Sequence, residues 1–189
     1  MQPIRLFWAV NLSSELKAKI AVLQSQLKKC GADVKWVDEE NFHLTVKFLG
    51  DTEPEIVPVM VKKMKQEVGG LGVFTLRIEK LGVFPGKGLP KVIWAGVNGK
   101  KDKFRNLYDR TQRSLRTLGF APDKKPLSPH LTLGRVRSAR GTKELTAAMA
   151  SFNSSNCFLG DEIIDSVDLM RSELTRNGAI YTIMESIVL

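Results

Sequence analysis

Two histidines, His43 and His130, are the only histidines in the 189-residue chain, and each opens the same tripeptide, His-Leu-Thr. Imidazole is the side chain whose ordinary pKa, about 6.5, lets it gain or lose a proton near neutral pH. Two such rings at one site can act as a pair, in which one ring takes a proton from water and the other donates to a departing oxygen. We therefore predict His43 and His130 as the acid and base of one active site.

The threonine two residues after each histidine belongs to the same predicted site. Side chains of a β-strand alternate between its two faces, so Thr45 shares a face with His43, and Thr132 shares a face with His130. Threonine hydroxyls can donate hydrogen bonds to the nonbridging oxygens of a phosphate and stabilise the charge of its transition state. This pattern needs no metal ion and no cofactor, and the spacing of the histidines fits no zinc motif.

Two basic residues near the motifs are candidate phosphate contacts. Strand alternation places Lys47 on the face of His43, where its charge can set the local potential. The same alternation sends Arg135 to the face opposite His130. Contact between Arg135 and a bound phosphate therefore requires a bulge or a strand end.

The histidine motifs are parts of a longer repeat. An 87-residue offset separates His43 from His130 and also Asn11 from Asn98, and the sequences around the asparagines, FWAVN and IWAGVN, are alike. Amphipathic helix patterns follow each asparagine, over residues 13–29 and 102–118. The repeated unit is strand, helix, strand. We predict an internal duplication with units at approximately residues 4–50 and 91–137.

The remaining patterns complete an α+β protein. We predict helices over residues 52–68 and 142–150, strands over 73–83 and 91–97, and a hairpin of 163–174 with 179–189 through Arg176-Asn177-Gly178. The predicted architecture is one bilobal domain, residues 1–189. Its two pseudo-symmetric lobes are each a largely antiparallel sheet backed by helices, and they face a central cleft.

The composition favours a polyanionic partner. Lys and Arg number 29 against 20 Asp and Glu, which gives a net charge of +9 and favours nucleic acid as the first candidate. Solvated surface charge explains this bias about equally well. Cys30 and Cys157 are isolated from each other in the sequence, so we expect two reduced thiols. No apolar run of about 18 residues is present to span a membrane, and we expect a cytoplasmic protein.

The segments Asn41–Gly50 and Ser128–Arg135 resemble the paired motifs of the 2H phosphoesterase superfamily. The opening Arg5-Leu6-Phe7 and the run Leu89–Val97 are also similar to its bacterial 2′-5′ RNA ligase branch, whose members are also called RNA 2′,3′-cyclic phosphodiesterases. The resemblance covers essentially the whole chain. It implies a bilobal fold in which both motifs line a central cleft.

The resemblance also implies an activity. A terminal RNA 2′,3′-cyclic phosphate is hydrolysed to a 2′-phosphomonoester without metal or ATP, and a reversible ligation forms 2′-5′ linkages, for example between tRNA halves. By this likeness His43 is the proton donor, His130 is the proton acceptor, and Thr45 and Thr132 hold the phosphate. Phe7 either stacks on a base or packs in the core beside Trp8.

Two other functions are compatible with the sequence. The first is a phosphodiesterase for small molecules, such as an ADP-ribose cyclic phosphate or a 2′-5′ oligoadenylate. The second is a noncatalytic RNA-binding module, which the positive charge permits but which does not require two matched His-x-Thr units. Because no coiled-coil pattern is present, we expect a monomer.

Overall fold

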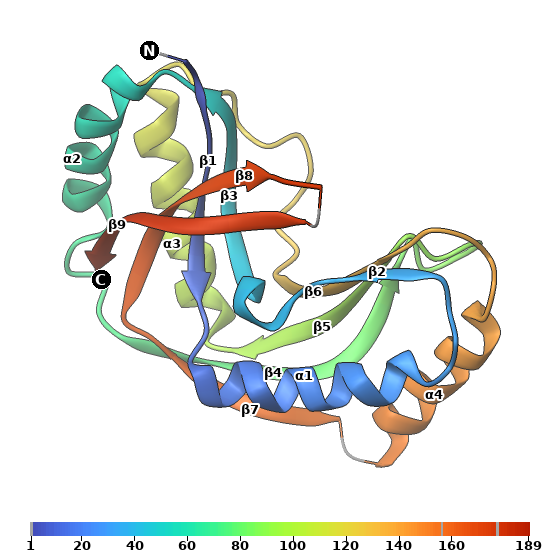
Figure 1. The fold of residues 1–189 in the computed structure, drawn as a ribbon. Helices are drawn as coiled ribbons and strands as arrows, with labels where there is room; N and C mark the ends of the chain where they lie inside the picture. The colour runs from blue at the N-terminus through green and yellow to red at the C-terminus, as the bar shows by residue number, and fades with distance from the viewer. Residues whose placement is uncertain (1, 156, 177) are drawn as a thin grey trace.

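The computed structural model describes residues 2–155, 157–176 and 178–189, which form two antiparallel sheets with helices against them (Figure 1). The four-stranded sheet has the order β3-β1-β8-β9, with strands β3 (His43–Thr52), β1 (Ile4–Asn11), β8 (Ser166–Leu174) and β9 (Ala179–Val188). The five-stranded sheet has the order β2-β6-β5-β4-β7, with strands β2 (Val34–Trp36), β6 (His130–Val136), β5 (Val92–Gly99), β4 (Phe74–Phe84) and β7 (Phe158–Ile164). The predicted α+β class with two antiparallel sheets is confirmed.

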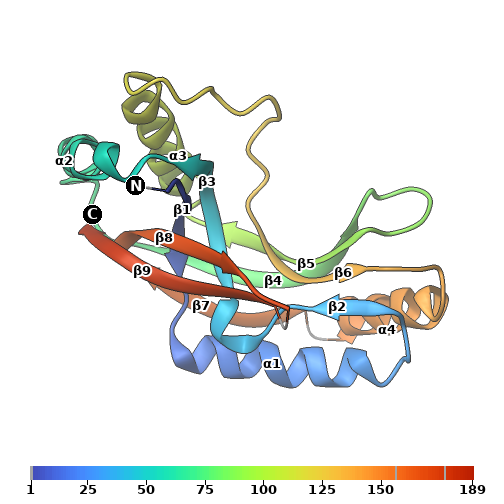
Figure 2. The same ribbon diagram turned by 45° about the horizontal axis from the view of Figure 1, so that its top comes forward.

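Two pairs of helices cover the sheets (Figure 2). Helices α1 (Ser14–Lys28) and α4 (Thr142–Ser155) lie against the five-stranded sheet. Helices α2 (Val57–Val68) and α3 (Lys101–Arg116) pack together, and α3 contacts β3 of the four-stranded sheet. Each sheet is therefore backed by helices, as the sequence predicts.

The helix of each predicted repeat unit packs on the sheet that does not contain the strand before it. The sequence did not indicate this arrangement. Helix α1 follows β1 of the four-stranded sheet but packs on the five-stranded sheet, where Leu16 lies against Gly160 of β7. The hydroxyl of Ser13, which caps α1, donates to Glu162 of β7 at 2.9 Å. Strand β2 also lies in the five-stranded sheet. This exchange buries the apolar side of α1 in one large core that draws residues from both sheets.

Both histidine strands carry a bulge directly after the threonine. The pairs on the two sides of each bulge are Ala9↔Thr45 and Trp8↔Lys47 in β1–β3, and Trp94↔Thr132 and Ile93↔Gly134 in β5–β6. Val46 and Leu133 are therefore the extra residues, and they are separated by the same 87-residue offset as the histidines. Strict alternation would place the residues after a bulge on one face of the sheet. The extra residue of the bulge moves them to the opposite face.

The C-terminal strands differ from the predicted hairpin at its start. The predicted strand over residues 163–174 is two strands in different sheets, because β7 ends at Ile164 and β8 begins at Ser166. At the crossing, the carbonyl of Asp165 accepts the N–H of Leu189 at 2.9 Å. Strands β8 and β9 do pair antiparallel, as predicted; Asn177 of the predicted turn lies outside the described residues. Helix α4 runs to Ser155, five residues beyond its predicted end.

A glycine in β4 makes room for a tryptophan of the neighbouring strand. Gly82 lies opposite Trp94, and a Cβ at Gly82 would lie 2.1 Å from Cζ2 of the indole. The Trp94 ring in turn contacts Phe84, with 5.1 Å between centroids, and Phe84 contacts the ring of His130. The space above Gly82 therefore sets the position of an aromatic chain that ends at a motif histidine.

We expect Gly82→Ala to lower the free energy of unfolding by about 1–3 kcal/mol, because the added methyl group must displace the Trp94 ring. Urea unfolding followed by circular dichroism measures this change. Gly86→Ala is the matched control, since a Cβ at Gly86 meets nothing within 4 Å. Equal stability of the two variants would contradict the steric account.

Candidate active site

One pocket contains both histidines and both threonines of the repeated motif. The pocket has a volume of about 180 Å³, and its lining includes His43, Thr45, Phe48, His130, Thr132 and Arg135. Strands β3 and β6, which contribute these residues, contact each other although they belong to different sheets. The structure thus brings the two motifs together, and we call this space the histidine pocket.

The same hydrogen bond orients both imidazole rings. Nδ1 of His43 lies 2.7 Å from the carbonyl oxygen of Asn41, and Nδ1 of His130 lies 2.8 Å from the carbonyl oxygen of Ser128. Because a carbonyl oxygen can only accept, Nδ1 carries the hydrogen in each ring. Nε2 is then the nitrogen that gains or loses a proton, and it is the nitrogen that a general acid or base would use.

His43 has a further polar partner within its own motif. Its Nε2 lies 3.1 Å from the hydroxyl oxygen of Thr45. With Nδ1 protonated and the ring neutral, the Thr45 hydroxyl is the donor in this bond. Thr45 is therefore close enough to His43 for both to contact a single small ligand.

Aromatic side chains hold the two rings from the side. The ring of Phe7 lies 5.0 Å from that of His43, and Tyr181 meets His43 edge-on at 5.3 Å. Phe84 meets His130 edge-on at 5.1 Å. Phe7 is only 2% exposed, so it has no free face for a base, and the core-packing alternative holds for it. It packs with Ala9 and Met170, in a small cluster separate from the core that contains Trp8.

Burial shapes the proton affinity of His43. Loss of solvation lowers its pKa below the ordinary value, and the nearby positive charge of Lys17 lowers the pKa further. The hydrogen bond to the Asn41 carbonyl opposes this shift, because it favours the protonated ring. The neutral form of His43 is thus favoured in the free protein.

The prediction that Lys47 shares the face of His43 is wrong. The bulge at Val46 turns Lys47 to the core face, where it lies opposite Trp8 and is 4% exposed. Its Nζ donates to the carbonyl of Ala121 at 2.8 Å and to Asp123 at 2.6 Å. Lys47 therefore anchors the segment that leads into the second motif and does not line the histidine pocket.

The bulges bring a different pair of side chains to the pocket. Arg135 lines it, which confirms the requirement for a bulge in β6. Phe48, the residue at the equivalent repeat position, also lines the pocket and is 64% exposed. Phe48 was not predicted from the sequence, although its 87-residue offset from Arg135 was a usable signal. Tyr181 was also missed, and no sequence pattern links this β9 residue to the motifs.

Some features bear on other chemistries. Within residues 2–155, 157–176 and 178–189, no group of three or more His, Cys, Asp or Glu side chains is arranged to hold a metal ion. Cys30 and Cys157 are free thiols and partly buried. None of the helices in the described part of the chain is long and apolar enough to cross a bilayer.

Residues 10–94 and residues 96–181 each match the model of one protein family, the LigT-like phosphoesterases. The chain belongs to this family. The match confirms the resemblance to 2H phosphoesterases that the motifs indicate. The family model aligns twice along the chain, and each aligned segment contains one of the two His-x-Thr motifs.

Individual relatives cover nearly the whole chain. An RNA 2′,3′-cyclic phosphodiesterase of Methanothermobacter thermautotrophicus is 34% identical over 182 residues, which cover 96% of this chain and 97% of that protein. A protein of the same name from Aeropyrum pernix is 30% identical over 163 residues, covering 86% and 90%.

Solved structures have the same fold. A protein of Thermus thermophilus superposes with a TM-score of 0.80 at 25% identity, covering 98% of this chain and 97% of that one. Escherichia coli LigT complexed with 3′-AMP gives a TM-score of 0.79 at 21% identity, covering 99% and 98%. At that identity the likeness to LigT establishes a shared fold.

We expect long-range ¹H–¹⁵N NMR to show that Nδ1 carries the hydrogen in the neutral rings of both His43 and His130. His43 should titrate below the ordinary imidazole pKa of about 6.5, because burial disfavours its charged form. Lys17→Met should raise the pKa of His43 by removing a repulsive charge, whereas the control Lys19→Met should leave it unchanged. A protonated Nε2 in either neutral ring would contradict the orientation inferred for that histidine.

Proposed function

We propose that this phosphoesterase hydrolyses the 2′,3′-cyclic phosphate at the end of an RNA and leaves a 2′-phosphomonoester. The observation that carries the proposal is the pair of imidazoles in one pocket, each with Nδ1 bound to a backbone carbonyl two residues earlier. This arrangement leaves two Nε2 atoms for proton transfer at a single phosphate. The names of the relatives from M. thermautotrophicus and A. pernix support the same substrate.

The proposed reaction is one in-line displacement at phosphorus. His130, as the acceptor, takes a proton from water through Nε2 while the water oxygen bonds to phosphorus. The bond from phosphorus to the 3′ oxygen breaks, and His43, as the donor, protonates that oxygen. Atoms and charge balance: water supplies the new P–O bond and one proton, and the proton transferred from His43 is replaced when the two rings exchange protons with solvent.

The threonines and the basic side chain have electrostatic roles in this scheme. Hydroxyls of Thr45 and Thr132 donate to the nonbridging oxygens, and the Arg135 guanidinium offsets charge that develops on them. The resemblance to the family supports His43 as the donor. Burial lowers its pKa in the free protein, so the bound phosphate anion must supply the opposite-charge interaction that favours the protonated ring.

The same residues support ligation, in which the 5′-hydroxyl of a second RNA end replaces water as the nucleophile. His130 takes the proton of this hydroxyl, the bond from phosphorus to the 3′ oxygen breaks, His43 protonates that oxygen, and a 2′-5′ linkage forms. The histidines exchange roles when the linkage is cleaved in the reverse direction. Halves of a cleaved tRNA are suitable substrates, because one carries a cyclic phosphate and the other a 5′-hydroxyl. The exposed ring of Phe48 at the pocket offers a face for the terminal base, and such stacking is worth about 1–3 kcal/mol.

We expect His43→Ala and His130→Ala each to reduce turnover of a cyclic-phosphate RNA by about 10²–10⁴-fold, the usual contribution of a general acid or base. Thr45→Val should cost about 10–100-fold through the loss of one charge-assisted hydrogen bond. The assay contains a chelator and identifies the monophosphate isomer by chromatography. Thr75→Val, at an exposed site on β4, is the matched control and should keep full activity. A 3′-phosphate product would refute the direction of ring opening.

The pH dependence tests the assignment of His43 as donor. A donor is active while protonated, so the rate falls as pH rises through its pKa. Burial lowers that pKa in the free protein, so the alkaline limb of kcat/KM should lie at a lower pH than the alkaline limb of kcat, which is measured with the anion bound. Lys17→Met should move the kcat/KM limb to higher pH, and Lys19→Met should not. If the pH of the kcat/KM limb is the same in Lys17→Met as in the wild type, the donor is a group other than His43.

A further inference from the structure

A second groove continues from the histidine pocket along the edge of both sheets. Its lining includes Arg5, Lys35, Asp38, Phe48, Arg135 and Tyr181, and we call it the cationic groove. Phe48, Arg135 and Tyr181 line the histidine pocket as well, so the two spaces are continuous. A ligand bound at the histidines can therefore extend directly into the cationic groove.

Within residues 2–155, 157–176 and 178–189, the cations of this groove have no counter-ion. Among the residues that the structure describes, no carboxylate forms an ion pair with Arg5, Lys35 or Arg135, and none of the three side chains donates a hydrogen bond to protein. Asp38 also lines the groove but is not paired with them. Arg77 on β4, by contrast, is paired with Asp161.

The strand register places two of these cations directly opposite each other. Lys35 on β2 pairs with Arg135 on β6. Like charges at directly opposed positions of an antiparallel pair are unfavourable. An anion bound between them removes this repulsion, so the arrangement favours an anionic ligand over an empty groove.

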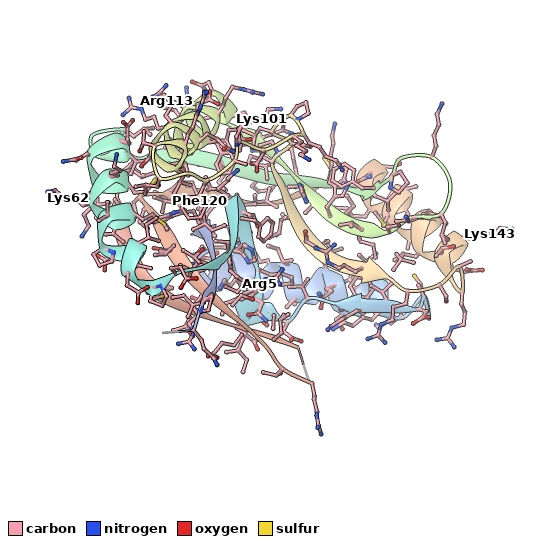
Figure 3. All side chains as sticks on the ribbon, turned by 90° about the horizontal axis from the view of Figure 1, so that it is seen from above. Arg5, Lys62, Lys101, Arg113, Phe120 and Lys143 are labelled. Atoms are coloured by element: carbon pink, nitrogen blue, oxygen red, sulfur yellow. The ribbon has the colours of Figure 1, made fainter. Side chains whose placement is uncertain are left out.

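Tyr181 connects the groove to the catalytic histidine. Its ring meets the His43 ring edge-on, and the charges of Arg135 and Arg5 both act on its hydroxyl. Burial nevertheless raises the pKa of Tyr181, so the hydroxyl keeps its proton and can donate a hydrogen bond. Arg5 shares a face of β1 with Phe7, which packs under His43. In Figure 3, Arg5 is labelled near the middle of the molecule, whereas Arg113 is labelled on the outer helix α3.

We propose that Arg5 and Tyr181 bind the phosphate on the 5′ side of the terminal nucleotide, so that the preferred substrate is an RNA chain end and not a mononucleotide. Arg135, which lines both spaces, lies between this phosphate and the cyclic one. This inference rests on the proposed function. A 2′,3′-cyclic phosphate occupies the 3′ end of an RNA, and every other phosphate of that strand lies on its 5′ side. A guanidinium and a phenol hydroxyl are suitable donors for the oxygens of a phosphodiester. Lys35 then lies along the path of the next nucleotide.

The groove on the other side of the histidines has a different chemistry. It is larger and mainly apolar, with Phe48, Phe84, Pro85 and Leu127 in its lining. Lys91 and Lys125 also line it, and its buried lysine, Lys47, is already paired with Asp123. This second groove offers surfaces for bases, and the cationic groove is the one suited to phosphates.

The experiment compares two substrates that differ by one phosphate. Adenosine 2′,3′-cyclic phosphate is assayed beside its 5′-phosphorylated form, with wild-type protein and with Arg5→Gln. In the wild type we expect the 5′-phosphate to raise kcat/KM by about tenfold or more, the effect of one hydrogen-bonded charge pair. Arg5→Gln should abolish most of this gain and leave the rate on the unphosphorylated substrate unchanged. On an oligonucleotide, it should reduce the slope of log kcat/KM against log salt by about 0.7.

Arg113→Gln is the matched control, because it removes the same charge from an exposed arginine on α3 and should preserve the gain. Circular dichroism checks that each variant is folded, and Lys35→Gln, with oligonucleotide substrates, is the second test of the groove. Absence of a gain from the 5′-phosphate in the wild type, or an equal loss on both substrates in Arg5→Gln, would overturn the inference alone. Failure of the wild type to hydrolyse the two mononucleotides and the cyclic-phosphate oligonucleotide would overturn the proposed function, and this inference with it.

Discussion

The hydrogen bond from each imidazole Nδ1 to a backbone carbonyl two residues earlier is the contact on which the site depends. It fixes the tautomer and the direction of the ring, because the carbonyl can only accept. A backbone acceptor cannot rotate away as a side chain can. The orientation of each ring is therefore set by the backbone that leads into the histidine strand, since Asn41 and Ser128 come just before β3 and β6. The rigidity of the site thus depends on the two sheets and on the segments that enter them.

That rigidity has to extend across two sheets, since each histidine opens a strand of a different one. The crossed helix α1 provides this connection, because it leaves the four-stranded sheet and packs on the five-stranded sheet through Leu16. The side-chain amide of Gln24, also on α1, donates to the carbonyls of Val37 and Leu133, at 2.7 and 3.1 Å. Leu133 is the bulged residue of β6, so the helix also holds the irregular point of the second motif. One shared core therefore fixes the distance between two half-sites.

We propose that the chain arose by duplication of a strand–helix–strand unit. The equal offset of the histidines, of their carbonyl partners Asn41 and Ser128, and of the bulged residues supports this origin. The two halves have nevertheless diverged where the substrate would be asymmetric. The residue after each bulge that faces the pocket is Phe48 in one half and Arg135 in the other. An aromatic face and a guanidinium suit the base and the phosphate of a single nucleotide.

Local sequence patterns were enough to predict the two-histidine site and the amphipathic helices and strands. Which other side chains lie beside the histidines depends on contacts between distant segments. Two histidines at matched positions, followed by threonines at a spacing of two, predict a paired site because strand alternation is a local property of the backbone. Helices with long apolar stripes, such as those after Asn11 and Asn98, are equally local. These features need no knowledge of the neighbours of a residue.

Thr45, Thr132 and Arg135 were predicted from the sequence, but other side chains around the histidines became known from the folded chain alone. Lys47 was assigned to the wrong face because a bulge arises from pairing with a second strand, and strict alternation cannot contain it. Arg5 and Tyr181 reach the site from β1 and β9, and their proximity depends on sheet order, which is a relation between distant segments. The crossing of α1 likewise follows from the need of both sheets for a shared core, and no single segment encodes it.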